Sequence, residues 1–236
     1  MNIIDYAIII FFALSVLMGM YRGSVATGLN LLGACLSLVI AKLFYPFVTE
    51  WIAGHEMWMD YLVYFSEGSS HIPTEMMEYA RTDVAALTAE QVGMVIKASG
   101  FTAPFDGYLT ENIANQVYAG QFTTLFDYFD QTVADVSLNA ISFVATFAFT
   151  YLVCTLLITL LDHTFTFPLL KAGDSLTGGV IGLGRAYLGM MILATLVPLV
   201  VNMLQIDLIS EMVDGSVLLD SFFPNNWFFS WIRSTI

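Results

Sequence analysis

The stretch LNAISFVATFAFTYLVCTLLITLL, from Leu138 to Leu161, carries no charged residue and decides the class of fold. A helix needs about 20 consecutive apolar residues to cross the hydrocarbon core of a bilayer. Further apolar runs of similar length extend from Ile3 to Met20, from Val25 to Phe44 and from Leu176 to Val201. Because a crossing segment must satisfy its own backbone hydrogen bonds, each run is expected to be a helix. The sequence therefore predicts an all-α, polytopic membrane protein with about four transmembrane helices.

The composition supports this class and excludes others. The chain has 236 residues, of which 58% are hydrophobic and 11% charged, whereas soluble domains carry about 25% charged residues. The formal net charge of −13 argues against a nucleic-acid partner, because phosphate binding needs clustered Lys and Arg. Cys35 and Cys154 lie inside apolar runs, so we expect two buried apolar residues and neither a disulfide nor a zinc site.

The apolar runs divide the chain into four parts. These are a transmembrane hairpin (1–45), an acidic, mostly helical insertion (46–137), a second pair of spans (138–203) and an acidic, aromatic tail (204–236). Trp and Phe beside polar residues suit the lipid–water interface, so the tail is expected there. The alternative is a hydrophobic tail that packs on the insertion.

The insertion contains several local signals. Thr88-Ala-Glu-Gln91 fits a helix capping box, while Glu67–Pro73 is expected to be a loop and Gly100–Gly107 a turn. From Thr110 onward, apolar residues recur near helical spacing, which predicts a helix that continues into the third span. This amphipathic pattern favours an insertion that packs on the spans over an independent globular domain.

Lys and Arg in short links indicate the orientation, because cytoplasmic loops are enriched in cations. Arg22, Lys171 and Arg185 would lie on the cytoplasmic side, against Lys42 and Arg233 on the other. This majority places both termini and the insertion outside the cytoplasm, with Arg22 and Arg185 near one membrane edge.

Two stretches carry small and polar residues on one helix face. Ser15, Gly19 and Arg22 share a face and are followed by Gly23, and a second face contains Asp174, Gly178, Gly182 and Arg185. Such small-residue faces let helix backbones approach closely, which predicts helix packing. An arginine within a span costs about 2.5–3.5 kcal/mol on insertion scales, so Arg185 needs acceptors. Asp162 or carbonyls at a helix end are the expected partners, and a proton or ion path is the alternative.

No catalytic site is predicted. His55, His71 and His163 do not have metal-ligand spacing, and no serine or cysteine motif marks a nucleophile next to Asp162-His163. We therefore expect neither an enzyme nor a bound cofactor or metal.

These motifs together resemble the CvpA family, which is named for colicin V production. The resemblance is carried by Asp5-Tyr-Ala-Ile-Ile, Ser15, Gly19-Met-Tyr-Arg22-Gly23, Asp174-x3-Gly178-x3-Gly182-x2-Arg185, Ser216 and Pro224-Asn225. The family pattern has glycine where this chain has Ala186 and often arginine where it has Ser175. The long insertion is similar to that of Gram-positive members.

The resemblance implies a protein of the bacterial cytoplasmic membrane involved in envelope function or in production and export of a colicin-type toxin. The same unit precedes extracytoplasmic serine proteases, which agrees with an outside C-terminus. We expect a non-enzymatic role through assembly in the lipid bilayer, as a homo-oligomer or with other membrane proteins. The alternative is an oligomeric pore or transporter for a small solute or ion, which would need polar residues along its conduit.

Overall fold

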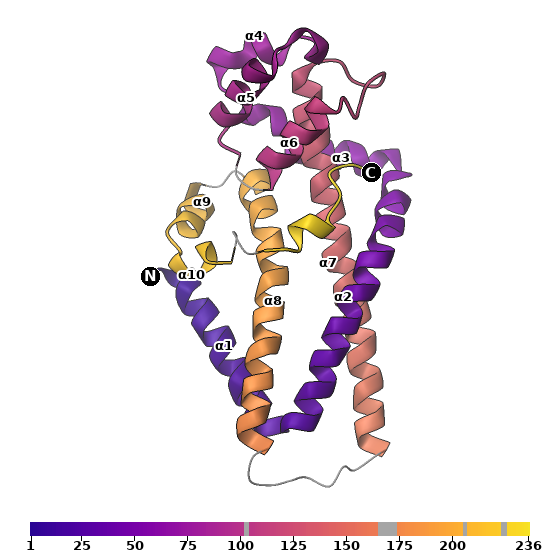
Figure 1. Cartoon of the computed structure of the whole chain (residues 1–236), viewed down its shortest axis with the longest axis vertical. Coiled ribbons are helices and arrows are strands. Elements are labelled where there is room, and N and C mark those ends of the chain that lie inside the picture. Colours follow the sequence, from indigo (N-terminus) through magenta and orange to yellow (C-terminus); the bar gives the residue numbers. More distant parts are fainter. Residues whose placement is uncertain (102–103, 165–173, 205–206, 223–225) are drawn as a thin grey trace. The chain divides into compact units, whose positions relative to one another are not determined.

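The computed structural model describes residues 1–101, 104–164, 174–204, 207–222 and 226–236 (Figure 1). Across these residues the secondary structure is helical apart from an isolated bridge between Asp83 and Thr124. The described part contains four helices that are long and apolar enough to cross a membrane. They are α1 (Ile3–Arg22), α2 (Ser24–Ala53), α7 (Leu125–Thr164) and α8 (Asp174–Leu204). The predicted all-α fold with four spans is confirmed.

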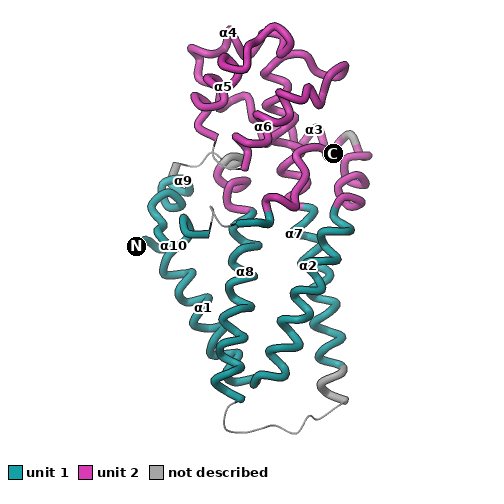
Figure 2. The backbone as a smooth tube through the Cα atoms, in the orientation of Figure 1, with its two compact units in different colours: residues 1–45, 142–195, 207–228 teal, residues 46–141, 196–206, 229–236 magenta. Residues whose placement is uncertain are grey.

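The chain forms two compact units, which Figure 2 distinguishes by colour. The first unit consists of residues 1–45, 142–195 and 207–228, and the second of residues 46–141, 196–206 and 229–236. The first unit therefore contains most of the spans, together with α9 (Asp207–Asp214) and α10 (Val217–Asp220).

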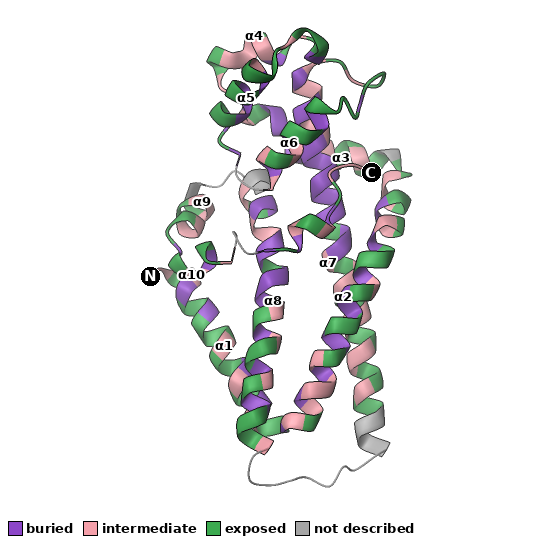
Figure 3. Cartoon of the chain, viewed as in Figure 1, coloured by how far each residue is buried: buried purple, intermediate pink, exposed green. Residues whose placement is uncertain are grey.

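Many large apolar residues on the helices of the first unit are exposed, and Figure 3 colours exposed residues green. The exposed set includes Ile10, Leu14 and Leu17 on α1, Leu32, Leu36 and Val39 on α2, Leu152, Leu156 and Leu160 on α7, and Val180, Leu183 and Leu193 on α8. Such a surface is costly in water and suits hydrocarbon. Both cysteines are free, and Cys35 is exposed on this outward surface of α2, so its expected burial is wrong.

Two of the spanning helices are longer than the apolar runs. The second run was expected to end at Phe44, but α2 continues to Ala53 with Pro46 inside it. A long membrane helix tolerates proline because neighbouring groups satisfy the freed carbonyl. The third apolar run begins at Leu138, but α7 begins at Leu125, where Thr124 and Asp127 accept from each other's backbone N–H groups. From Leu125 onward, the predicted continuation of a helix of the insertion into the third span is confirmed.

The second unit begins with the end of α2 and continues through short helices. These are α3 (Glu56–Ser66), η1 (Gly68–His71), η2 (Thr74–Met76), α4 (Met77–Ala80), η3 (Val84–Ala86), α5 (Ala89–Ala98) and α6 (Phe105–Ala114). The capping box at α5 is confirmed: the Thr88 hydroxyl accepts from the Gln91 N–H, and the Gln91 side chain accepts from the Thr88 N–H.

Other local expectations for the insertion are corrected. The helix predicted to run from Thr110 into the third span is broken between α6 and α7, where Gln116 and Gly120 have positive φ angles of 48° and 88°. The expected turn at Gly100–Gly107 already contains the start of α6, because Phe105 is fully buried and draws its segment into the core. The expected loop at Glu67–Pro73 includes the 3-10 turn η1.

A hydrophobic core of its own holds the second unit together. Val95 of α5, Phe105 and Leu109 of α6, and Phe129 and Val133 of α7 are all 0% exposed. These residues belong to one cluster that also includes Leu199 and Ile232. The segment 46–141 is therefore folded around apolar contacts that link distant parts of the sequence.

The last residues of the chain are held by polar side chains of this unit. The Asn139 side-chain amide donates to the carbonyl oxygens of Arg233 and Thr235 at 3.0 and 3.1 Å. Asn112 donates to the Ser234 carbonyl at 3.2 Å, and η4 (Phe229–Trp231) lies next to the Tyr108 hydroxyl, which donates to the Phe229 carbonyl. Residues 229–236 therefore pack on the insertion, which was the alternative to the interfacial tail.

Near this segment, Asp135 is buried and accepts from the Tyr118 hydroxyl at 2.8 Å and from Gln131 at 2.8 Å. The pKa of Tyr118 is raised above its ordinary value, mainly by burial and secondly by the charge of Asp135. Tyr118 therefore keeps its proton and acts as the donor.

Replacement of Asn139 by leucine should release the final segment. Asn139→Leu keeps the volume but removes the amide that donates to two carbonyl groups, and each hydrogen bond contributes about 0.5–1.5 kcal/mol. Hydrogen exchange of residues 229–236 should become faster. Asn115→Leu is the matched control, because Asn115 is exposed at the end of α6. Unchanged exchange in Asn139→Leu would contradict the assigned role.

Candidate functional site

The start of α1 is fixed by a buried carboxylate. Asn2 and Asp5 form a capping box, in which the Asn2 side chain accepts from the Asp5 N–H and Asp5 accepts from the Asn2 N–H at 2.9 Å. The Asp5 side chain is 0% exposed, so its remaining lone pairs need donors. They accept from the Ser216 hydroxyl at 2.7 Å and from the Leu218 N–H at 3.0 Å.

These contacts connect the two ends of the first unit. Ser216 caps α10 by accepting from the Leu219 N–H, so Asp5 and Ser216 together hold the start of that helix. Further along, the Asn226 amide donates to the Met191 carbonyl of α8 at 3.1 Å. The segment after α8 is therefore joined to both α1 and α8. Pro224 and Asn225, which also carried the resemblance, lie outside the described residues.

Glycines allow α1 and α8 to touch backbone to backbone. A Cβ atom added to Gly19 would collide with the carbonyl oxygen of Gly178, and one added to Gly178 would collide with that of Gly19. A Cβ atom on Gly182 would lie 2.5 Å from the Ser15 carbonyl oxygen. The small residues of the two predicted faces thus meet, and no larger side chain fits between them.

Beside this contact, the turn between α1 and α2 is bound to the start of α8. Gly23 has a φ of 82°, which favours glycine. The Asp174 carboxylate accepts from the Ser24 N–H at 2.7 Å and from the Ser24 hydroxyl. Ser175, where the family pattern often has arginine, donates to the Met20 carbonyl at 3.1 Å and so satisfies the end of α1.

The two arginines lie in different surroundings. Arg22 ends α1 and is exposed. Arg185 is half-buried next to Ser15, which precedes Arg22 by roughly 10 Å at about 1.5 Å per residue. That both arginines lie near one membrane edge stays a prediction. Two further predicted groups lie outside the described residues. They are Lys171 and the side chain of Asp162, which was an expected partner of Arg185.

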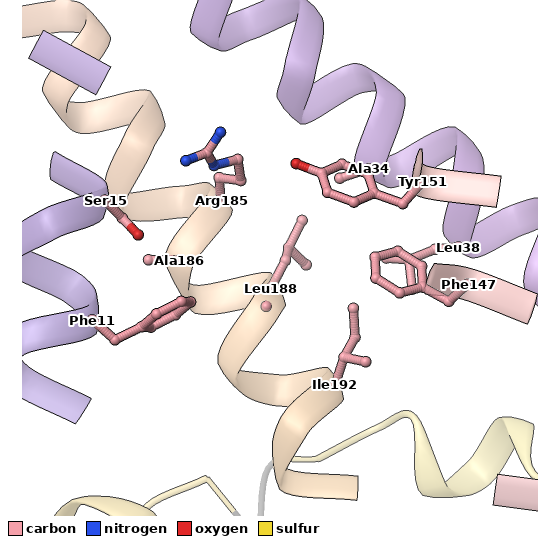
Figure 4. Close-up of a pocket in the computed structure, with 11 residues that line it drawn as sticks. Phe11, Ser15, Ala34, Leu38, Phe147, Tyr151, Arg185, Ala186, Leu188 and Ile192 are labelled. Carbon is pink, nitrogen blue, oxygen red and sulfur yellow. The ribbon is translucent and has the colours of Figure 1, made fainter. Parts of the chain in front are cut away.

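Arg185 lines a cavity of about 260 Å³ within the first unit (Figure 4). We call this cavity the Arg185 pocket. Its walls come from all four long helices: Phe11 and Ser15 of α1, Ala34 and Leu38 of α2, Phe147 and Tyr151 of α7, and Arg185, Ala186, Leu188, Gly189 and Ile192 of α8. Figure 4 shows the Tyr151 hydroxyl on the wall that faces Arg185, directed toward the guanidinium.

The structure therefore gathers the predicted residues at two places. Asp5 lies at the tie to α10, whereas Ser15, Gly19, Gly23, Asp174, Gly178 and Gly182 lie along the α1–α8 contact. Ser24, Tyr151 and Asn226 also belong to these arrangements, although no sequence motif singled them out. Ser24 directly follows Gly23 and was a recognisable donor, whereas Tyr151 becomes informative only when α7 is placed beside Arg185.

Among the described residues, no group of three or more His, Cys, Asp or Glu side chains is arranged to hold a metal ion. The polar groups at the α1–α8 contact bond backbone and hydroxyl groups instead, so this arrangement serves to hold helices together.

Two glycines of α8 give a matched pair for the packing argument. Gly182→Leu should destabilise the protein by about 1–3 kcal/mol, because overpacking displaces the α1 backbone. Gly184→Leu should leave the melting temperature in detergent unchanged, because nothing lies within 4 Å of a Cβ atom placed there. Equal melting temperatures for the two variants would contradict close packing at Gly182.

Loss of the Asp5 carboxylate should loosen the segment after α8. Asp5→Ala leaves the Leu218 N–H and the Ser216 hydroxyl without their acceptor, so limited proteolysis within residues 207–222 should become several-fold faster, as expected for a loss of about 1–3 kcal/mol. Asp214→Ala, at an exposed position of α9, serves as the control. Equal cleavage in both variants would argue against the tie.

Comparison with protein families identifies the chain. The model for the colicin V production protein matches residues 4–71 and 84–226, which include both arrangements described above. Comparisons with curated proteins and with solved structures gave no match. Because the family match extends over most of the sequence and its four spans, this chain is a membrane protein that belongs to the colicin V production protein family.

Proposed function

We propose that this chain is a non-enzymatic assembly component of the bacterial cytoplasmic membrane. In this role it takes part in envelope function or in production and export of a colicin-type toxin, through lateral contacts with further copies or with other membrane proteins. The main observation in support is that the carboxylates at the starts of two spanning helices bind groups of the same chain. Asp5 and Asp174 accept hydrogen bonds from the chain itself, and the glycines pack α1 on α8.

The outward surface of the spans supports the same role. Exposed apolar side chains on α1, α2, α7 and α8 are available to lipid and to helices of a partner. Association of membrane helices depends on shape and close packing, since lipid is as apolar as the side chains. A rigid unit with a fixed outer shape is suited to such contacts.

Cross-linking in native membranes tests this proposal. Single cysteines at Leu36 and Leu152, in a background without Cys35 and Cys154, should form specific cross-links to a second copy or to one membrane protein. Gly182→Leu should abolish them, whereas Gly184→Leu should retain them. A chain that cross-links to nothing in its native membrane would argue against assembly. A defined ring of four or more copies that conducts ions in liposomes would favour the pore instead.

For orientation, we propose that the insertion and both termini lie outside the cytoplasm and that Arg22 lies inside. The proposal comes from the cations in the short links. In the same cysteine-free background, an impermeant thiol reagent should label Glu75→Cys but not Arg22→Cys in intact cells. Both positions are exposed, so access within the protein does not bias the result. Labelling at position 22 alone would reverse the orientation.

A further inference from the structure

The Arg185 pocket combines a charge with an apolar lining. Five of the residues that line it are buried, namely Ser15, Ala34, Leu38, Ala186 and Ile192. The half-buried side chains of Phe147, Tyr151, Arg185 and Leu188 complete the wall, together with the more exposed Phe11. The volume of about 260 Å³ far exceeds the roughly 10–15 Å³ that holds one water molecule. The pocket is therefore large enough for part of a ligand.

The guanidinium of Arg185 has no hydrogen bond or ion pair with any residue that the structure describes. The nearest carboxylate on the same helix, Asp174, is bound to Ser24, and Asp5 is bound to Ser216 and Leu218. Arginine cannot lose its proton to avoid the cost of burial. An acceptor that carries negative charge is therefore the group that this site lacks.

A second donor faces the same space. The Tyr151 hydroxyl lies across the pocket from Arg185 in Figure 4, and neither it nor the Ser15 hydroxyl bonds to a described residue. A planar guanidinium binds the two oxygens of a phosphate or carboxylate at once, and a phenol adds a third hydrogen bond. These groups together select an oxyanion.

The remaining residues that line the pocket favour a hydrocarbon part of a ligand. Phe11, Leu38, Phe147 and Leu188 offer no polar group to a ligand, and they belong to helices that are long and apolar enough to cross a membrane. A soluble anion would leave these surfaces unoccupied. An amphiphile with an anionic head and an aliphatic chain would fill both parts of the pocket.

We propose that the Arg185 pocket binds an anionic phospholipid, with the phosphate held by Arg185 and Tyr151 and a segment of acyl chain against Phe147 and Leu188. Arg185 lies roughly 16 Å along α8 from Asp174, at about 1.5 Å per residue. The head group would therefore lie well inside the span, unlike those of the surrounding bilayer.

Lipid-dependent thermal stability of the full chain in a non-ionic detergent tests the proposal, with lipid-bound species counted by native mass spectrometry. Phosphatidylglycerol should raise the melting temperature and remain bound, whereas phosphatidylcholine with the same acyl chains should do neither. Equal effects of the two lipids would overturn the charge selection. Inorganic phosphate alone should not stabilise the protein, and a shift as large as that of phosphatidylglycerol would overturn the lipid assignment.

Variants then locate the site. Arg185→Gln should weaken phosphatidylglycerol binding by roughly tenfold or more, as expected for loss of a charge-assisted hydrogen bond. Arg81→Gln, at an exposed arginine of the second unit, should bind as the wild type does. Should Arg185→Gln fail to fold, Tyr151→Phe, which removes only the hydroxyl, and Leu188→Trp, which fills the chain region, test the same pocket. Wild-type affinity in Arg185→Gln, or in both of the other two, would overturn the proposal.

Discussion

The close backbone contact between α1 and α8 at Gly19, Gly178 and Gly182 is the constraint on which the first unit depends. Lipid offers apolar side chains as good an environment as a protein core does, so helices in a membrane need shape complementarity to associate. Glycine supplies it here by removing the atoms that would separate the two backbones. Once this contact is made, the turn at Gly23 lies beside Asp174, and the hydrogen bonds to Ser24 follow from that proximity.

The carboxylates of this unit follow a common rule. Asp5 and Asp174 each bind a serine hydroxyl and a backbone N–H from a segment far away in sequence. A carboxylate that accepts from backbone groups has its donors fixed by the fold itself, so it needs no long cationic side chain to reach it. Asp5 therefore fixes the start of α10 beside α1. Asp174 fixes the start of α8 beside the turn that follows α1.

The spans and the helix-packing faces could be predicted from the sequence because apolar length and glycine spacing are local signals. The pairing of Asp5 with Ser216 could not, since it joins residues at opposite ends of the chain. Helical spacing upstream of Leu138 indicated that a helix continues into the third span, but the place where α7 begins depends on the mutual capping of Thr124 and Asp127, which hydropathy does not mark. The break before it depends on Gln116 in a left-handed conformation, which sequence spacing does not reveal. The position of Arg185 within an apolar run marks it in the sequence as a residue that needs acceptors, whereas the place of Tyr151 beside it is apparent only in three dimensions.

The same packing that closes α1 onto α8 explains why a pocket opens at Arg185. At Gly19 and Gly182 the two backbones touch, whereas one turn beyond Ser15 the ring of Phe11 fills the distance to Gly189, where a Cβ atom would lie 3.4 Å from the ring edge. The helices therefore diverge from the turn toward the start of α1, as Figure 1 also shows. Arg185 lies where this divergence begins, beside Ser15 and opposite Tyr151. A leucine there would leave the gap lined by apolar groups on that side. An arginine in that place keeps the gap polar at one end, and this difference gives the pocket its selectivity for an anion.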